Sequence, residues 1–272
     1  MNDLVRIGDF LVEVSFYFEG CVTLDNVTVV ILTYNEEKLI EKAIQSALQC
    51  TSHVLVVDSG STDQTTTIAK ELGATVVYRK WDDDFSAQRN FALQHVTTQW
   101  VLYLDADEFI NQELAEEIRR VTSQEQPFYS YEIVRRAFAF GKRFKHGSMR
   151  PDKVQRLFPR DAVTWINKVH ERPETNLAVK TLKGYADHYT YTSWEQYWNK
   201  FNHYTSIWAE DAYKRGKKGS YLSAFGHATY GFIKITFLDK GILDGWLGLV
   251  MCCNHFMYTL MKYVKLVGLD KR

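Results

Sequence analysis

The chain has 272 residues, 46% of them hydrophobic and 24% charged, which is typical of a folded protein long enough to bury a full core. Its formal net charge at pH 7 is zero, which excludes a generally basic, nucleic-acid-binding surface. The charge is unevenly spread: residues 190–272 hold 11 Lys and Arg against 6 Asp and Glu, and the preceding residues hold 22 against 27. A basic segment on an acidic body predicts different roles for the two regions.

The first segment, residues 1–26, alternates in places between apolar and polar side chains and predicts an added strand or two. Acidic residues interrupt its apolar runs and no basic stretch precedes them, so we expect no signal peptide there. The chain has four cysteines without Cys-x-x-Cys spacing: Cys21, Cys50, Cys252 and Cys253. This spacing argues against a zinc site or a redox pair and favours a reducing compartment.

From Val27 onward, apolar strands alternate with amphipathic helices. The predicted strands are residues 27–33, 54–58, 74–79 and 100–105, and the predicted helices are residues 36–50, 65–72 and 85–96. Continuous β-branched runs are typical of strands buried on both faces. Strands separated by helices predict right-handed crossovers and therefore a parallel sheet.

The pattern changes after about residue 122. Four further strands are predicted at 128–140, 155–158, 163–166 and 180–188, separated by turns, which indicates an antiparallel extension of the sheet. The chain is predicted helical from Ser193, and two apolar segments follow at 221–238 and 242–269. We therefore expect an α/β fold in three parts: an N-terminal extension (1–26), a sheet domain (27–190) and a helical C-terminal region (191–272).

The fourth predicted strand runs directly into Asp105-Ala106-Asp107-Glu108. Ligands of open α/β sheets bind at the carboxyl ends of the strands, and paired carboxylates there suit a hard divalent cation that in turn holds a diphosphate. The alternative is an acidic turn or a helix N-terminus, where Asp is also favoured.

Two other strands end in polar residues. The first is followed by Thr33, Tyr34, Asn35 and Glu36, and the second ends at Asp58 before a Ser-Gly-Ser-Thr-Asp turn. Each alone is equally typical of a helix N-terminus or cap. Together with Asp105 they predict a crevice for a nucleotide and a metal. The sequence has neither a GxGxxG nor a GxxxxGK[ST] pattern, so dinucleotide and P-loop binding are not supported.

These motifs, taken as a set, resemble those of the family 2 glycosyltransferases. The resemblance rests on Val-Val-Ile-Leu-Thr-Tyr-Asn-Glu-Glu at 29–37, Val-Val-Asp-Ser-Gly-Ser-Thr-Asp at 56–63, Phe85-Ser86 with Arg89-Asn90, and the Asp-Ala-Asp-Glu of 105–108. It covers roughly residues 27–190 and implies an inverting enzyme with the GT-A fold. Val-His-Glu-Arg-Pro at 169–173 is similar to a narrower branch, the bacterial lipopolysaccharide-core β-1,4-glucosyltransferases.

The resemblance implies a role for each motif residue. Thr33, Tyr34, Asn35 and Glu36 would line a uridine pocket, Asp58 would bind the uracil edge, and Arg89 would lie near the nucleotide. Asp105 would face the ribose and the metal, and Asp107, as the second Asp of a DXD motif, would ligate Mg²⁺ or Mn²⁺. His188 is a further candidate ligand, with a packed structural histidine as the alternative.

An inverting transfer needs a general base opposite the leaving group, and we expect Glu171 in that role. The family commonly has Asp in the comparable stretch, Asp161 and Asp187 are rivals, and the alternative for Glu171 is a surface ion pair with Arg172. Three further residues are candidates for contacts with the donor or the acceptor: Arg156, Trp165 and His170. Core packing is the alternative for Trp165.

The sequence thus predicts a hexosyltransferase that moves a hexose, glucose by the resemblance, from a UDP-sugar to a cell-envelope glycolipid such as lipopolysaccharide core. Alternatives are an exopolysaccharide or capsule intermediate or a peptide as acceptor, a nucleotidyltransferase, and a non-catalytic nucleotide-sugar-binding protein. The apolar run 246–261 is interrupted at Asn254 and His255, so we expect no membrane span. Its basic flanks favour a cytoplasmic protein lying on the inner face of the cell membrane. Packing on the sheet domain, or a homodimer, is the alternative.

Overall fold

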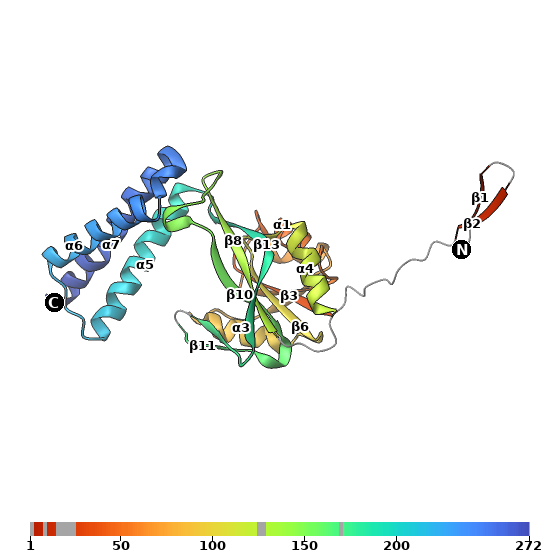
Figure 1. The fold of residues 1–272 in the computed structure, drawn as a ribbon. Coiled ribbons are helices and arrows are strands. Elements are labelled where there is room, and N and C mark those ends of the chain that lie inside the picture. Colours follow the sequence, from red (N-terminus) through yellow and green to blue (C-terminus); the bar gives the residue numbers. More distant parts are fainter. Residues whose placement is uncertain (1–2, 8–9, 15–25, 124–128, 169–170, 272) are drawn as a thin grey trace.

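The computed structural model describes residues 3–7, 10–14, 26–123, 129–168 and 171–271. Figure 1 shows a sheet-containing body and a group of long helices beside it. Within the N-terminal segment, β1 (Asp3–Ile7) and β2 (Phe10–Val14) pair antiparallel, as the alternating residues predicted.

Four parallel strands form one half of the main sheet, in the order β5-β4-β3-β6. They are β3 (Val27–Thr33), β4 (His53–Asp58), β5 (Thr75–Tyr78) and β6 (Trp100–Asp105). The helices between them are α1 (Ile40–Ala47), α2 (Thr65–Glu71) and α3 (Phe85–Leu93). The parallel sheet with helical crossovers is therefore confirmed.

Helix α1 begins four residues later than its apolar pattern predicted. The backbone N–H groups of Glu36 and Glu37 donate instead to Thr65 Oγ1 and to the Asp63 carboxylate, at 2.8 and 3.2 Å. Asn35 has a left-handed backbone, with φ of 53°. The backbone N–H groups of Leu39 and Ile40 both donate to the Glu36 carbonyl, at 3.0 and 2.9 Å, so residues 36–39 form a turn that leads into the helix.

The second half of the sheet is mixed. Strand β10 pairs antiparallel with both β6 and β8, whereas β13 pairs parallel with β8 and antiparallel with β7. The elements of this half are β7 (Glu108–Ile110), α4 (Gln112–Thr122), β8 (Tyr129–Ala139), β9 (Lys142–Arg143), η1 (Gly147–Met149), β10 (Asp152–Pro159), η2 (Arg160–Ala162) and β13 (Ala178–Tyr191). The extension is therefore antiparallel only in part. A separate hairpin of β11 (Thr164–Ile166) and β12 (Arg172–Glu174) lies beside α3.

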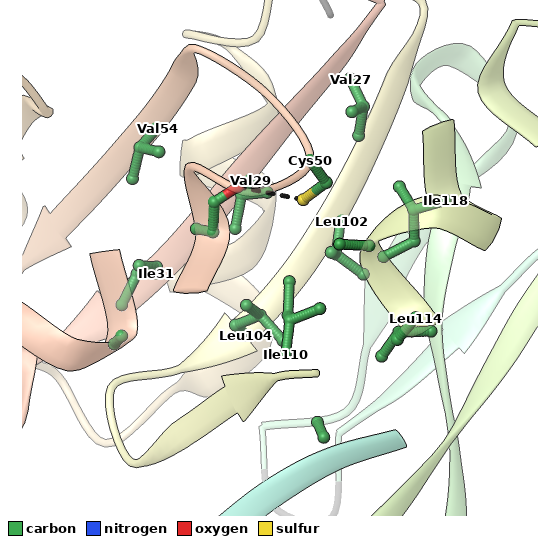
Figure 2. Packing of buried hydrophobic residues seen from close by; sticks show 14 of the residues in the cluster. Val27, Val29, Ile31, Cys50, Val54, Leu102, Leu104, Ile110, Leu114 and Ile118 are labelled. Atoms are coloured by element: carbon green, nitrogen blue, oxygen red, sulfur yellow. Dashed lines mark hydrogen bonds between the residues drawn. The ribbon is translucent and has the colours of Figure 1, made fainter. Parts of the chain in front are cut away.

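The core lies on both faces of the parallel strands, because successive side chains of a strand point to opposite faces. Along β3, Val29 and Ile31 pack with α1 and α4 on one face, and Val30 packs with α3 and β11 on the other. Figure 2 shows the first cluster, where Leu102 and Leu104 of β6 meet the residues of β3 and α4. Burial on both faces fixes the strands and therefore the edge at which they end.

The C-terminal region contains three long helices: α5 (Trp194–Lys214), α6 (Tyr221–Ile233), continued by a π-helical turn η3 (Lys234–Leu238), and, after the short η4 (Gly241–Asp244), α7 (Gly245–Asp270). Helix α7 packs against both α5 and α6 (Figure 1). We call α5 to α7, with η3 and η4, the helical region.

The buried Asp244 joins this region to the sheet. Its carboxylate accepts hydrogen bonds from the backbone N–H groups of Lys145 and His146, at 3.0 and 2.8 Å, and lies 3.1 Å from the His146 ring. Burial acts to raise the pKa of Asp244, but the hydrogen bonds from His146 and Lys145 outweigh burial and lower it. None of the helices among the described residues combines the length and the apolarity needed to cross a bilayer.

Candidate active site

The polar strand ends meet at one edge of the sheet. Residue Thr33 of β3 is the register partner of Asp58 of β4, and Leu32 of β3 is the partner of Asp105 of β6. The three residues Thr33, Asp58 and Asp105 therefore end adjacent parallel strands, which is the position at which open α/β sheets bind ligands.

The loop after β3 is held against the loop after β4. The backbone N–H of Asn35 donates to Ser61 Oγ at 2.8 Å, and the Asn35 side-chain oxygen accepts from the backbone N–H of Thr62 at 2.8 Å. These bonds leave the ring of Tyr34 exposed at the edge, whereas the hydroxyl of Thr33 is buried without a hydrogen-bond partner among the described residues.

Asp58 is buried and shapes the second loop. Its carboxylate accepts from the backbone N–H groups of Gly60 and Ser61, at 2.9 and 3.0 Å. Gly60 has φ of 107°, which a side-chain-bearing residue rarely adopts, so the close turn requires glycine. The carboxylate therefore fixes the conformation of this loop.

A network of buried charges lies under the Asp-Ala-Asp-Glu segment. Asp105 accepts from Arg89 at 3.0 Å and from Arg156 at 2.8 Å, and the fully buried Glu108 accepts from Arg156 and Arg135. Burial acts to raise the pKa of Asp105, but the two neighbouring guanidinium groups hold it well below its usual range. Asp105 is therefore ionised and oriented by the arginines.

Arg89 also packs between aromatic rings. Its guanidinium lies 4.7 Å from the ring centroid of Trp165 and 5.5 Å from that of Tyr103, and burial lowers its pKa. Trp165 is held in turn by Asn90, whose side chain donates to its carbonyl at 2.8 Å and accepts from its N–H at 2.9 Å. Arg156 and Trp165 thus both lie within the same cluster as Arg89 and Asp105.

Among the described residues, Asp107 has His188 and not an arginine as its ion-pair partner. Its carboxylate lies 3.4 Å from His188 Nε2, and its backbone carbonyl accepts from the N–H of Tyr189 on β13. Burial acts to lower the pKa of His188, but the hydrogen bond and charge of Asp107 raise it. Burial, and next the charge of Asp107, raise the pKa of Glu36 to about 7. Glu36, Asp107 and His188 form one electrostatically coupled group.

This group suits a cation that is shared with a ligand. Among the described residues there is no cluster of three or more His, Cys, Asp or Glu side chains that could hold a metal ion unaided. Mg²⁺, however, is commonly held by only one or two protein carboxylates together with substrate phosphates and water. One carboxylate and one imidazole next to a polar crevice fit that mode of binding.

Glu171 lies near the same guanidinium nitrogen of Arg89 that contacts Asp105. Its carboxylate is 3.8 Å from the Arg89 guanidinium and is partly exposed, just before β12. The two rival bases are engaged elsewhere, because Asp161 pairs with Arg160 and Asp187 pairs with Arg136. His170 lies outside the described residues.

Two side chains that the sequence did not assign to the site come from helix α5. Burial, and next the charges of Glu171, Asp107 and Asp105, raise the pKa of Tyr204, and the charge of Lys200 acts on Glu36. In the sequence Tyr204 belongs to an aromatic series with helical spacing, which predicted packing. In the sequence, the hydroxyl group of this tyrosine was the one feature that distinguished it from a purely packing residue.

A cleft of about 420 Å³ opens between the sheet and the helical region, and His188 is among its lining residues. Its lining combines aromatic rings with polar groups from β8, η1, β10, β13, α5 and α7: Arg135, Ala137, Ser148, Met149, Arg150, Asp152, His188, Thr190, Tyr191, Tyr197, Met251, His255 and Tyr258. Rings with hydroxyl and imidazole groups suit a sugar, which has an apolar face and a polar rim.

Comparison with known proteins adds the family. Residues 28–184 match the sequence profile described as Glycosyl transferase family 2. An uncharacterized glycosyltransferase of Rickettsia prowazekii is 31% identical over 258 residues, covering 90% of this chain and 87% of that protein. One of Rickettsia typhi is 30% identical with the same coverage.

More distant matches are partial. The glycosyltransferase SunS of Bacillus subtilis is 30% identical over 149 residues, which are 54% of this chain and 34% of SunS. Among solved structures, S. aureus TarS aligns with a TM-score of 0.44 at 18% identity, covering 61% of this chain and 37% of that one. Similarity at that level indicates neither substrate nor mechanism.

Proposed function

The chain belongs to glycosyltransferase family 2, and from that premise we propose that it is a metal-dependent hexosyltransferase using a UDP-sugar, with glucose as the proposed hexose. The acceptor we propose is a sugar hydroxyl of a cell-envelope glycolipid such as lipopolysaccharide core. The observation that carries the proposal is the convergence of Thr33, Asp58 and Asp105 at one sheet edge, beside the Asp107–His188 pair. Residues 27–190 would form the catalytic domain, and residues 191–272 would form the helical region attached to it.

The donor would lie along the strand ends. Tyr34 offers an exposed ring and Asp58 a buried carboxylate for the base, while Thr33, Asn35 and Glu36 shape the floor. Arg89 holds Asp105, which we propose to face the ribose.

Asp107 and His188 would hold Mg²⁺ or Mn²⁺, with Asp105 as a further candidate. The cation, when bound, would neutralise the negative charge that develops on the leaving diphosphate. Two protein ligands leave the remaining coordination positions to phosphate and water.

Glu171 would act as the general base. It would take the proton from the acceptor hydroxyl, whose oxygen forms the new bond to the anomeric carbon while the bond from that carbon to the diphosphate breaks. UDP leaves with the electron pair of the broken bond, and the configuration at the anomeric carbon inverts. The Glu171 carboxylate lies 3.8 Å from the Arg89 guanidinium, which also contacts Asp105.

The cleft between sheet and helices would receive the acceptor sugar, because His188 and three tyrosines are among the residues that line it. Burial raises the pKa of Tyr191 and Tyr197 above the usual value of a tyrosine, so their hydroxyls stay neutral hydrogen-bonding groups. An exopolysaccharide or capsule intermediate, or a peptide, is the alternative acceptor.

The decisive experiment incubates the purified protein with a panel of UDP-sugars, Mg²⁺ or Mn²⁺, and delipidated or intact envelope extract. We expect UDP release and transfer of labelled sugar to a glycolipid. Release of UDP with label in polysaccharide or peptide would replace the acceptor. Nucleotide binding without release under any condition would mean a non-catalytic binding protein, and release of pyrophosphate from a sugar phosphate and UTP would mean a nucleotidyltransferase.

A glycolipid acceptor implies that the enzyme works at a membrane surface. We therefore propose a cytoplasmic protein attached peripherally to the inner face of the cell membrane.

A further inference from the structure

Helix α6 has apolar side chains on two opposite faces. Small residues, Ala224 and Ala228, are buried against the neighbouring helix α7. Large apolar residues point outward instead, and Leu222 is 84% exposed. A helix of a water-soluble protein normally shows the reverse, with large apolar residues inward and polar residues outward.

The exposed apolar surface continues beyond α6 through η3 and η4 to the start of α7. We call it the outer face, and its members are Leu222, Phe225, Tyr230, Ile233, Phe237, Leu238, Ile242, Leu243 and Trp246. Leu238 is 71% and Trp246 is 79% exposed. So many exposed large apolar side chains, close together along residues 222–246, indicate an interaction site.

The outer face is presented by a tightly packed turn. A Cβ added to Gly241 would lie 2.7 Å from Cys252 Sγ, and one added to Gly248 would lie 2.4 Å from the carbonyl oxygen of Gly241. The backbones of η3, η4 and α7 are therefore in close contact, and the exposure of the residues between them is built into the packing.

Unpaired cations flank the outer face. Lys214, Arg215, Lys217 and Lys218 precede α6, and Lys234 and Lys240 lie within the outer segment; all are exposed. In the described part of the chain, no carboxylate forms an ion pair with Lys214, Arg215, Lys218, Lys234 or Lys240. The two acids between residues 214 and 246 are engaged, since Asp239 pairs with Arg150 and Asp244 is buried.

We propose that the outer face docks on an anionic lipid bilayer, with α6 lying flat in the interface. Apolar side chains that include Tyr and Trp, flanked by cations, are the chemistry that such an interface accepts. A second copy of the chain fits less well, because a two-fold interface would bring the same unpaired cations of both copies together.

Docking would also orient the active site. His255 of α7 lines the cleft and lies against α6, where a Cβ added to Gly231 would be 3.4 Å from its ring. Because α7 lies between them, the cleft is separated from α6 by about one helix layer, roughly 10 Å. This consequence rests on the proposed function, since it assumes that the cleft takes the sugar of a lipid-anchored acceptor.

The docking is tested on the full chain with vesicles of phosphatidylcholine alone or with 30% phosphatidylglycerol, without any donor or acceptor. We expect binding to the anionic vesicles at least tenfold tighter than to the neutral ones, weakening with salt. The double variant Leu222→Glu/Trp246→Glu should lose at least tenfold in affinity, and Lys218→Glu/Lys234→Glu should lose the preference for anionic lipid.

Matched controls carry the same changes on the body: Leu48→Glu/Val179→Glu at exposed apolar positions, and Lys70→Glu/Lys183→Glu at exposed lysines. These should bind vesicles like the unaltered protein. Equal vesicle binding by test and control variants overturns the proposal, as does a dimer in light scattering that only the outer-face variants dissociate. Vesicle binding without sugar transfer would instead count against the proposed function alone.

Discussion

The sheet-containing body (residues 27–190) and the helical region place their large apolar side chains in opposite ways. In the parallel half of the sheet, strands such as β3 and β6 are buried on both faces, and polar groups gather at the strand ends. In the helical region, α6 buries alanine and exposes leucine, phenylalanine and tyrosine. The body completes its core within the chain, whereas the helical region leaves a surface that calls for a partner outside it.

The charges differ in the same sense. In the body, arginines and carboxylates are buried in pairs around Asp105 and Glu108. In the helical region, five exposed cations have no ion-pair partner among the described residues. Buried pairs indicate a fixed site, and unpaired exposed cations indicate an anionic surface as partner.

The largest expected effect is on the stability of the body. Arg156→Met removes a buried cation and leaves Asp105 and Glu108 with one guanidinium fewer. Breaking a buried pair from one side costs about 3–5 kcal/mol, which urea unfolding monitored on the sheet would measure. The partly exposed Arg160→Met serves as control and should change stability by less than about 0.5 kcal/mol. Equal effects would mean that the buried network does not support the body.

Asp107→Ala tests the cation site. We expect cation-dependent UDP binding to be lost and transfer to fall roughly 10³-fold, the scale of losing a major electrostatic contact in a transition state. Calorimetric titration of UDP with and without Mn²⁺ measures the binding, and thermal unfolding checks the fold. Asp161→Ala, at an exposed aspartate on the same body, should bind normally. Retained cation dependence in Asp107→Ala would remove the role given to this residue.

Glu171→Gln separates binding from chemistry. The neutral isostere should keep UDP-sugar affinity within about twofold, while the rate of transfer falls roughly 10²-fold or more, as expected on losing a general base. Single-turnover kinetics, with Asp187→Asn as the matched control, show whether Glu171 or Asp187 is the base. A normal rate in Glu171→Gln together with a slow Asp187→Asn would move the base to β13.

Asp244→Ala tests the joint between the two regions. Loss of the carboxylate leaves the N–H groups of Lys145 and His146 without their acceptor, at a cost of about 1–3 kcal/mol. Hydrogen exchange should become faster in η4 and the start of α7 while β3 and β6 stay protected. Uniformly faster exchange would show that the two regions unfold as one unit.

The smallest expected effect is the pH dependence contributed by Glu36. Because burial and Asp107 raise its pKa from 4.5 to about 7, the folded state binds this proton more tightly than the unfolded state. Its contribution to stability is fully present below pH 4.5 and is lost as the pH rises to about 7. In metal-free buffer, Glu36→Gln should flatten the slope of stability between these values, with Glu37→Gln as control. An unchanged slope would assign the effect to another group.

The sequence predicted local features well where one periodicity dominated. The bounds of β3 and β6 match the predicted strands, because uninterrupted apolar runs leave no other way to bury both faces. The start of α1 was wrong by four residues, because hydrogen bonds between Asn35 and the loop of Ser61 and Thr62 hold a left-handed residue and a turn ahead of the helix. A hydrogen bond between distant loops has no periodicity to reveal it.

Partners across the sheet were equally hidden. Asp107 and Asp105 are two residues apart, yet Asp105 is bound by arginines of α3 and β10 and Asp107 by a histidine of β13. The parallel pairing of β13 with β8, which the sequence did not predict, accompanies this arrangement.

By itself, the sequence determined the parallel sheet, the acidic and polar strand ends, and the contrast between an acidic body and a basic, aromatic tail, because these follow from local composition and spacing. Only the tertiary structure decided which carboxylate is locked between arginines, which one is left beside a histidine, and which side of α6 faces outward. Those outcomes depend on contacts between residues far apart in the chain, where burial and charge pairing, and not local pattern, select the arrangement.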